Sequence, residues 1–354
     1  MIAAGGPPET ATPGHYRDLK KIVKASGLLR KQPFYYSAKS ALLFGLFGCS
    51  VAILCLTRSL PVQALNLGLF AFVFAQFGLL GHDAGHNQIF RKLRANTLFG
   101  RICGNLLLGM DLNWWRGHHN AHHGRPNQEG FDPDADIPVL AFTPEQGARR
   151  RGLFRWFSRY QSFLMPILPG WQVFDLNLRS AGFLMRRRSK RLYLASGLLI
   201  AHVVLYATIL VLTQGIVHGL LFALVQRVVS GFYLATIFAT NHTAMPILSA
   251  SQKMDFLHQQ VVTSRNIKPP RGFAFLFGGL HLQIEHHLFP TMARNQLKRV
   301  QPIVRAFCAE HGLPYRETPF LTTYGEIFRH MRGVSRTMTR LAAGSAPRPA
   351  TAGS

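Results

Sequence analysis

Four long segments without charged residues constrain the fold of this 354-residue chain more than any other feature. They span residues 41–57, 60–81, 192–214 and 216–240, and only the last is interrupted by a charge, Arg227. A helix needs about 20 apolar residues, within a range of about 17–25, to cross the hydrocarbon core of a bilayer. The sequence therefore predicts an all-α integral membrane protein with four transmembrane helices in two hairpins, joined by a long polar segment.

The basic residues indicate which parts of the chain share one side of the membrane. Of the 40 Lys and Arg residues, all but Arg58 and Arg227 lie in the N-terminal, middle and C-terminal polar segments. Because Lys and Arg accumulate in cytoplasmic loops, we predict a multi-pass protein whose two termini are cytosolic. We expect a cytosolic tail over 1–39, a main domain over 40–315, and a cytosolic C-terminal segment over 316–354 that is disordered at its end.

The composition argues against other classes of protein. A net charge of +25 would suit a nucleic-acid-binding protein, yet the chain shows no zinc-finger spacing, helix-turn-helix signature or aromatic RNA-binding motif. Four scattered cysteines are too few for a disulfide scaffold, and 48% hydrophobic residues exclude intrinsic disorder. We therefore expect the lipid bilayer, and no nucleic acid, as a partner.

Histidines gather just past the second and fourth apolar segments and in the segments predicted to be cytosolic. They occur in H-D-A-G-H, H-N-A-H-H and Q-I-E-H-H, together with one histidine after the fourth segment. The residues concerned are His82, His86, His119, His122, His123, His242, Gln283, His286 and His287. Side chains three and four residues apart lie on one face of a helix, about 5–6 Å apart at Cβ. Eight imidazoles are too many for one ion, so the spacing predicts two metal ions.

The residue types alone leave the identity of the metal open. The cysteines are scattered, so thiolate ligands are not expected. Imidazole suits zinc, copper, iron and nickel alike. We expect the nearby acids Asp83 and Glu285 to orient ligands and to offset the charge of the metal.

At these motifs the sequence resembles the membrane fatty acid desaturase family. The three histidine boxes match in order and spacing, and so do the flanking stretches W-W-R-G-H-H-N-A-H-H-G-R-P-N, V-V-T-S-R-N-I and G-G-L-H-L-Q-I-E-H-H-L-F-P. The resemblance covers about residues 34–315. Gln283 at the start of the third box resembles the front-end subgroup, which acts between an existing double bond and the carboxyl end of the chain.

The resemblance implies a cytosolic helical cap that holds a diiron centre on the four spanning helices. The implied iron ligands are His82, His86, His119, His122, His123, His242, His286 and His287. The implied activity is O₂-dependent desaturation in fatty acid biosynthesis, on an acyl chain carried by CoA, a carrier protein or a lipid. Gln283 stands where other subgroups place His, and it either ligates weakly or shapes the substrate site. His281 stands where the subgroup usually has Asn, and it is either a ninth ligand or a neighbour of the ligands.

Many front-end desaturases carry a fused cytochrome b5 domain with a His-Pro-Gly-Gly motif, which this sequence lacks. The expected partner is therefore an external electron donor, a ferredoxin or a separate cytochrome b5-type protein.

Two other functions stay open. One is a hydroxylase or other oxygenase on the same diiron scaffold. The other is a non-catalytic metal-binding membrane protein, for which ionisable residues inside the spans would be expected. Arg227 is the only Lys, Arg, Asp or Glu inside a predicted span. It faces protein or a substrate head group, or the membrane depth assigned to it is wrong.

Overall fold

The computed structural model of the chain describes residues 14–187 and 192–342. Within these ranges the protein is mostly helical, as predicted. The disordered end predicted for the C-terminal segment lies outside the described residues, as does the beginning of the N-terminal tail.

Within the described residues, four helices are long and apolar enough to cross a membrane. They are α2 (Pro33–Leu56), α3 (Leu60–Gly85), α9 (Tyr193–Gln214) and α10 (Ile216–His242). Each contains a predicted apolar segment almost in full, but α2 begins earlier than predicted. The reason is that Lys39 ends the uncharged run without ending the helix, which starts at Pro33, where proline is favoured in the first turn.

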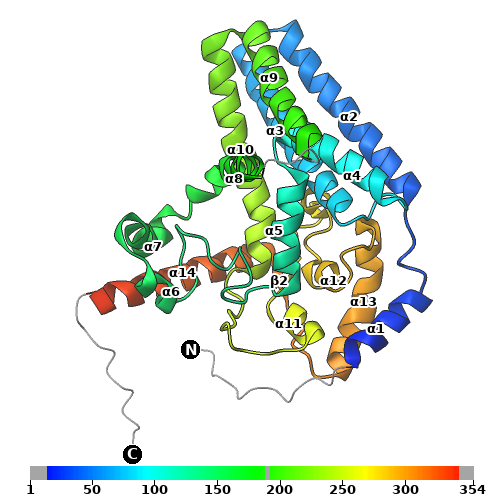
Figure 1. Cartoon of the computed structure of the whole chain (residues 1–354), viewed down its shortest axis with the longest axis vertical. Helices are drawn as coiled ribbons and strands as arrows, with labels where there is room; N and C mark the ends of the chain where they lie inside the picture. Colours follow the sequence, from blue (N-terminus) through cyan, green and yellow to red (C-terminus); the bar gives the residue numbers. More distant parts are fainter. Residues whose placement is uncertain (1–13, 188–191, 343–354) are drawn as a thin grey trace, which may run out of the picture.

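The four helices pack side by side in the upper part of Figure 1. α3 and α10 contact each other, α2 packs on α3, and α9 packs on α10. The two tight connections meet at one end, where Arg58 Nε donates to the carbonyl oxygen of Thr213 at 2.8 Å and Gln214 Nε2 to that of Leu54 at 2.6 Å. The opposite end of α3 carries His82 and His86 and that of α10 carries His242, so connections and these histidines lie at opposite ends of the bundle.

Helices from the middle of the chain pack on the histidine-bearing side of this bundle. They are α4 (Leu93–Arg101), the π-helix η1 (Ile102–Leu108), α5 (Leu112–Gly124), the 3₁₀ helix η2 (Leu168–Trp171) and α8 (Gln172–Arg186). η1 contacts both α3 and α9, while α8 and η2 contact α10. The side chain of Asp111 caps the N-terminus of α5 by accepting from the backbone N–H groups of Asn113 and Trp114, at 3.0 and 2.8 Å.

A cap with its own apolar core covers the end of the bundle that carries the histidines. Its elements are α1 (His15–Ala25), α11 (Phe256–Val262), η4 (Ala274–Phe277), α12 (Gln283–Leu288) and α13 (Arg294–Glu310). The core includes Leu19, Val261, Ile284, Leu288 and Val300, each fully buried. α12 packs on both α11 and α13, which fixes the third histidine box against the bundle.

The prediction of an all-α fold needs one correction. Strands β1 (Asn266–Lys268) and β2 (Glu317–Pro319) pair in parallel, with Asn266 opposite Glu317. The N–H and C=O groups of a buried extended segment need partners, and this pairing supplies them where the chain passes beneath α12. Three-residue strands have too little periodicity for the sequence to predict them.

The last described helix, α14 (Phe320–Ala342), packs on α6 (Pro144–Arg149) and α7 (Gly152–Leu164) at the lower left of Figure 1. An ion pair at 2.8 Å between Arg316 and Glu326, together with Arg265 on the same carboxylate, ties this helix to the cap.

Candidate metal centre

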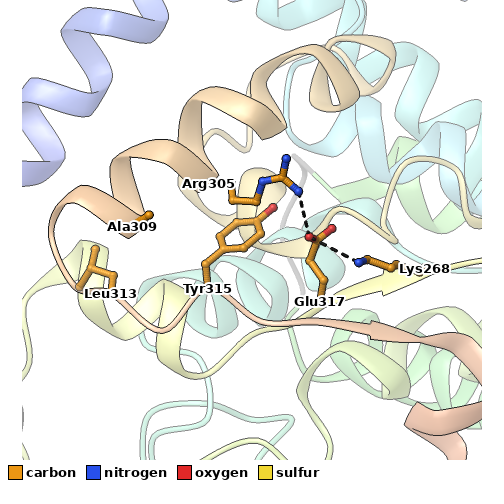
Figure 2. Close-up of a pocket in the computed structure, with 6 residues that line it drawn as sticks. All are labelled: Lys268, Arg305, Ala309, Leu313, Tyr315 and Glu317. Carbon is orange, nitrogen blue, oxygen red and sulfur yellow. Dashed lines mark hydrogen bonds and ion pairs between the residues drawn. The ribbon is translucent and has the colours of Figure 1, made fainter.

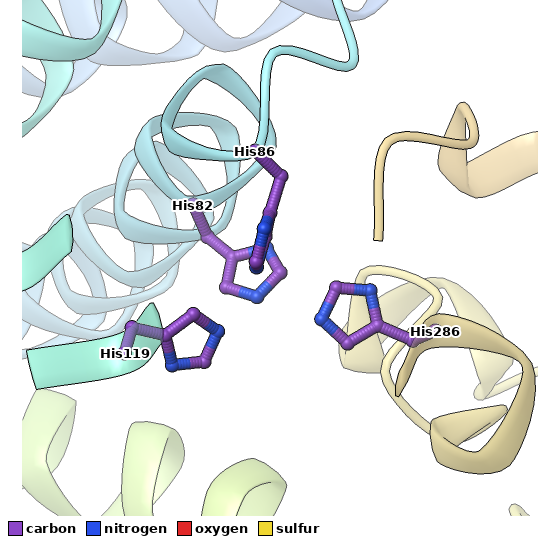
Figure 3. Close-up of side chains that lie close together, drawn as sticks. All are labelled: His82, His86, His119 and His286. Atoms are coloured by element: carbon purple, nitrogen blue, oxygen red, sulfur yellow. The ribbon is translucent and has the colours of Figure 1, made fainter. Parts of the chain in front are cut away.

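The first group of histidines lies where α3, α5 and α12 meet. His82 and His86 come from the end of α3, His119 from α5 and His286 from α12. Their candidate ligand nitrogens all lie within 4.8 Å of one another. Figure 3 shows the four rings directed towards a common space.

A second group lies beside the first. His122 of α5, His242 at the end of α10 and His287 of α12 also bring their nitrogens within 4.8 Å of one another. Their ring centroids are 4.6–5.0 Å apart. Neighbouring residues of α12 thus belong to different groups, because His286 faces the first and His287 the second.

His123 lies between the two groups. Its ring stacks on His287 with centroids 4.1 Å apart, and its centroid is 4.7 Å from that of His86 and 4.8 Å from that of His286. Its Nε2 is 3.0 Å from the Nε2 of His119. All eight histidines singled out in the sequence are therefore in one contiguous cluster.

Several buried ring nitrogens in the cluster have no hydrogen-bond partner within the described part of the chain. Among the described residues, the Nε2 atoms of His82, His86, His286 and His287 have no hydrogen-bond partner although they are buried. An unsatisfied buried polar group costs about 1–3 kcal/mol, so four in one place need an explanation. Metal ions bound at these nitrogens would supply the missing partners, and the imidazole donor set fits such ions.

Hydrogen bonds on the other ring nitrogens orient the second group. The Nδ1 of His242 is 3.1 Å from the carbonyl oxygen of Thr263, which can only accept. The Nδ1 of His287 is 2.7 Å from Gln260 Oε1, and that of His122 is 3.0 Å from Asp132 Oδ2. With the proton on Nδ1, the Nε2 of each ring presents its lone pair towards the group, although that of His242 also lies 3.0 Å from the amide nitrogen of Gln283.

The electrostatics favour neutral rings in most of the cluster. Burial, with neighbouring imidazoles adding to it, holds the pKa of His119, His123, His286 and His287 well below the ordinary value. For His122 burial also acts to lower the pKa, but Asp132 and Asp134 outweigh it and the pKa is raised. Neutral imidazole is the form that binds metal.

Asp132 is a functional candidate that the sequence analysis missed. Its carboxylate is buried, and besides His122 it accepts from the backbone N–H groups of Asn127 at 2.7 Å and Asp134 at 2.9 Å. The signal was present in the stretch D-P-D-A-D that follows the second box. What the sequence did not indicate is that Asp132 is the acid hydrogen-bonded to His122, whereas Asp134 pairs with His118 at 2.7 Å.

We expect Asp132→Asn to weaken metal binding by about 10–100-fold, as is typical when the partner of a ligating histidine is removed. An amide in this position would turn an N–H group towards a backbone N–H that now donates to the carboxylate. Metal per chain after dialysis and a cobalt(II) titration measure the effect. Asp136→Asn, in the same stretch but in an exposed ion pair with Arg150, is the matched control. Equal affinity in the two variants would contradict the role of Asp132.

The glycine of the first box has a packing role. The ring of Trp115 stacks on His119 with centroids 4.4 Å apart and lies 5.3 Å from His82. A Cβ at Gly85 would lie 2.1 Å from Trp115 Cζ3. Only glycine therefore allows this indole to close one side of the first group.

The two acids expected to assist the ligands have different roles. Asp83 approaches the Nδ1 of His82 at 3.4 Å, but its main partners are the guanidinium of Arg294 and the hydroxyl of Tyr36, the latter at 2.9 Å. Glu285 instead accepts from Asn266 Nδ2 at 2.7 Å and Tyr315 Oη at 2.6 Å. Glu285 therefore ties α12 to β1 rather than orienting an imidazole.

Tyr315, which donates to Glu285, also lines a surface pocket of about 380 Å³ (Figure 2). In this pocket Glu317 lies 3.4 Å from Arg305 and 3.8 Å from Lys268. Burial raises the pKa of Glu285 to about 7, against the hydrogen bonds from Tyr315 and Asn266 that act to lower it. The pocket thus adjoins the support of the third box rather than the histidine cluster itself.

Gln283 and His281 are placed differently with respect to the cluster. The Nε2 of Gln283 is 3.0 Å from the Nε2 of His242, and its Oε1 accepts from Asn241 at 3.2 Å. Its amide therefore borders the second group. His281 lies outside both groups, with its ring 6.0 Å from that of Phe277.

Residues 59–319, which include all three boxes, match the family model described as fatty acid desaturase. The chain belongs to the fatty acid desaturase family. Its predicted family and enzyme class are thereby confirmed, and the cluster described above is the histidine cluster of this desaturase.

Named relatives align with most of the desaturase. The chain is 28% identical over 332 residues to the acyl-lipid (9-3)-desaturase of Physcomitrium patens. This alignment covers 90% of the present chain and 62% of the relative. The chain is 31% identical over 343 residues to the delta(5) fatty acid desaturase fat-4 of Caenorhabditis elegans, covering 92% and 75%. For the delta(8)-fatty-acid desaturase of Euglena gracilis the identity is 29% over 327 residues, and the alignment covers 88% of the present chain and 77% of that relative.

Proposed function

We propose that this desaturase introduces a double bond into a fatty acyl chain with O₂ as co-substrate, at a diiron centre held by the eight clustered histidines. The observation that carries this proposal is the division of the cluster into two groups with unpaired, buried Nε2 atoms directed inwards. Two ions would fit such a cluster, and family membership favours iron among the metals that suit imidazole.

Iron ions bound at the cluster would supply the oxidising chemistry, in which two hydrogens from the acyl chain and two electrons from an external donor together reduce O₂ to two molecules of water. The chain's own residues hold and orient the ions. His82, His86, His119 and His286 would hold one ion, His122, His242 and His287 the other, and His123 lies where it contacts both groups. Gln283 borders the second group, where we propose that its amide shapes the space for the acyl chain or contacts the metal. Trp115 and the cap exclude water from the cluster.

We propose that α2, α3, α9 and α10 cross the membrane as two hairpins, with the cap, the metal centre and both termini in the cytosol. The meeting of the two tight connections at one end of the bundle supports this arrangement. The distribution of basic residues supports the orientation, because all but Arg58 and Arg227 belong to segments assigned to the cytosolic side.

A pocket beside the second box suits an acyl substrate with an anionic head group. Its volume is about 530 Å³, within the range of ligand sites. The lining residues are Trp114, Leu178, Arg179, Gly182, Phe183, Arg186 and Arg187. A lining that combines apolar side chains with three guanidinium groups matches an amphiphile, whether acyl-CoA, acyl-carrier protein or acyl-lipid.

We expect the double variant Arg186→Gln/Arg187→Gln to raise the KM for the acyl substrate about fivefold with little change in kcat, because exposed charge pairs are each worth up to about 1 kcal/mol. Initial rates at varied substrate concentration measure this. Arg151→Gln, at the exposed start of α7, is the control. A fall in kcat at constant KM would place these arginines in another role.

The electrons are proposed to come from an external donor, a ferredoxin or a separate cytochrome b5-type protein. An acidic surface on such a donor would complement the excess of basic residues in the cap.

The proposed function is tested by expression in a host of known lipid composition under ¹⁸O₂, with His122→Ala as the inactive comparison. Mass spectrometry should locate a new double bond in an acyl chain that retains no ¹⁸O. An acyl product that contains ¹⁸O would identify an oxygenase instead. Metal-replete protein that changes no acyl chain in any host, with reductant supplied, would favour a non-catalytic metal-binding protein.

A further inference from the structure

Arg227 of α10 lies inside a span yet is held entirely by neutral groups. Its Nη1 donates to Asn177 Oδ1 at 2.7 Å and to the carbonyl oxygen of Leu108 at 3.4 Å, and its Nη2 is 2.8 Å from His202 Nε2. The guanidinium also lies 5.1 Å from the ring centroids of both Phe74 and Tyr206. Within the described residues no carboxylate pairs with it, although a charge at this depth is costly.

The partners of Arg227 have defined roles in the same network. His202 Nδ1 is 2.9 Å from the carbonyl oxygen of Leu106, which can only accept, so the proton is on Nδ1 and Nε2 accepts from Arg227. Asn177 Nδ2 donates to the carbonyl oxygens of Leu108 at 3.1 Å and Gly109 at 2.7 Å. Side chains from α8, α9 and α10 therefore converge on the carbonyl groups of one short segment, those of Leu106, Leu108 and Gly109.

That segment is the C-terminal end of the π-helix η1. The last carbonyl groups of a helix lack partners within the helix, and they carry a partial negative charge that favours a cation. Gly109 follows in the left-handed conformation with φ +73°, and a Cβ there would lie 2.7 Å from His202 Cδ2. Only glycine therefore allows η1 to end this close to the ring of His202 on α9.

The end of η1 determines where the second histidine box begins. Only Gly109, Met110 and Asp111 separate η1 from α5, which carries His119, His122 and His123. Asp111 caps α5, and its own N–H donates to Ser180 Oγ of α8 at 3.0 Å. A displacement of the end of η1 would therefore also displace α5 and its three histidines, because only a short, hydrogen-bonded linker joins the two helices.

We propose that Arg227 is a positioning residue for the metal centre: with His202 and Asn177 it fixes the end of η1 and thereby the start and direction of α5. This proposal rests on the proposed metal-binding function of the cluster. It assigns the charge inside the fourth span to the protein rather than to a substrate head group.

The test compares Arg227→Met with the wild type by cobalt(II) titration and by the visible spectrum of the bound ion. Methionine fills similar space without the charge or the donors. We expect metal binding about tenfold weaker and an altered ligand-field spectrum in folded, membrane-inserted protein, with partial recovery in Arg227→Lys. Arg58→Met is the matched control, because Arg58 also donates to a helix-terminal carbonyl but at the opposite end of the bundle.

If Arg227→Met has a lower melting temperature but an unchanged cobalt(II) spectrum and unchanged metal affinity, Arg227 has only a structural role and the proposal is overturned. If Arg227→Met fails to insert, Asn177→Ala decides, since it removes the contacts to Leu108 and Gly109 from outside the spans. An unchanged spectrum in that variant also overturns the proposal. Failure of the wild type to bind metal would instead refute the proposed function.

Discussion

His286→Ala and His287→Ala should each abolish desaturation while affecting different metal ions. The two side chains are neighbours on α12, but His286 lies with His82, His86 and His119, and His287 with His122 and His242. Removing only the hydrogen-bond partner of a ligating histidine typically costs 10–100-fold, so loss of a ligand should cost more than about 100-fold in activity. We expect each variant to hold about one iron fewer than the wild type.

Iron per chain and product formation should be measured together on detergent-purified, correctly inserted protein. Mössbauer spectra of the two variants should differ, because a different ion remains in each. His218→Ala, at the other end of α10, is the control. His281→Ala should also retain full iron, since its ring lies outside both groups. Normal iron and normal activity in either His286→Ala or His287→Ala would refute the ligand assignment.

Arg294→Leu should be the most destabilising substitution outside the histidine cluster. The Arg294 guanidinium and the Asp83 carboxylate form an ion pair in which both side chains are almost fully buried, at 3% and 2% exposure. Removal of one partner leaves an uncompensated buried charge, which typically costs about 3–5 kcal/mol. Because Asp83 is adjacent to His82, the metal centre should also be disturbed.

The free energy of unfolding in detergent, or the thermal midpoint where unfolding is irreversible, measures this loss. The double variant Asp83→Asn/Arg294→Leu should recover part of the stability, because no charge is then left unpaired. Arg299→Leu on the same helix, α13, is the control for loss of a cation. A double variant that is less stable than Arg294→Leu alone would show that the buried charge is not the cause.

The features predicted correctly from the sequence are those that depend on neighbouring residues. Four apolar runs suffice to locate four helices long and apolar enough to cross a membrane, and helical spacing suffices to group His119, His122 and His123 on one face. The ends of the helices were predicted less accurately than their existence. α2 begins before its predicted segment, because a single lysine ends an apolar run without ending a helix.

Features that depend on distant residues could not be predicted in the same way. Asp83 was expected to assist a ligand, yet its main partner is Arg294, more than half the chain away. Nothing in the third box indicates that its two histidines face different groups, because that division depends on where α5 and α10 meet α12. The selection of Asp132 among three nearby acids likewise depends on a turn that the backbone makes at Asn127.

The order in which the cluster's members occur along the chain has a consequence for biosynthesis. His82 and His86 leave the ribosome early, whereas His286 and His287, which complete the two groups, emerge only after all four long apolar helices have been synthesised. Until then each ion would have only an incomplete set of ligands and would exchange with its surroundings. Metal uptake should therefore be a late step, completed only when the cap closes over an already inserted bundle. Chains that stall before α12 should be inserted in the membrane but metal-free.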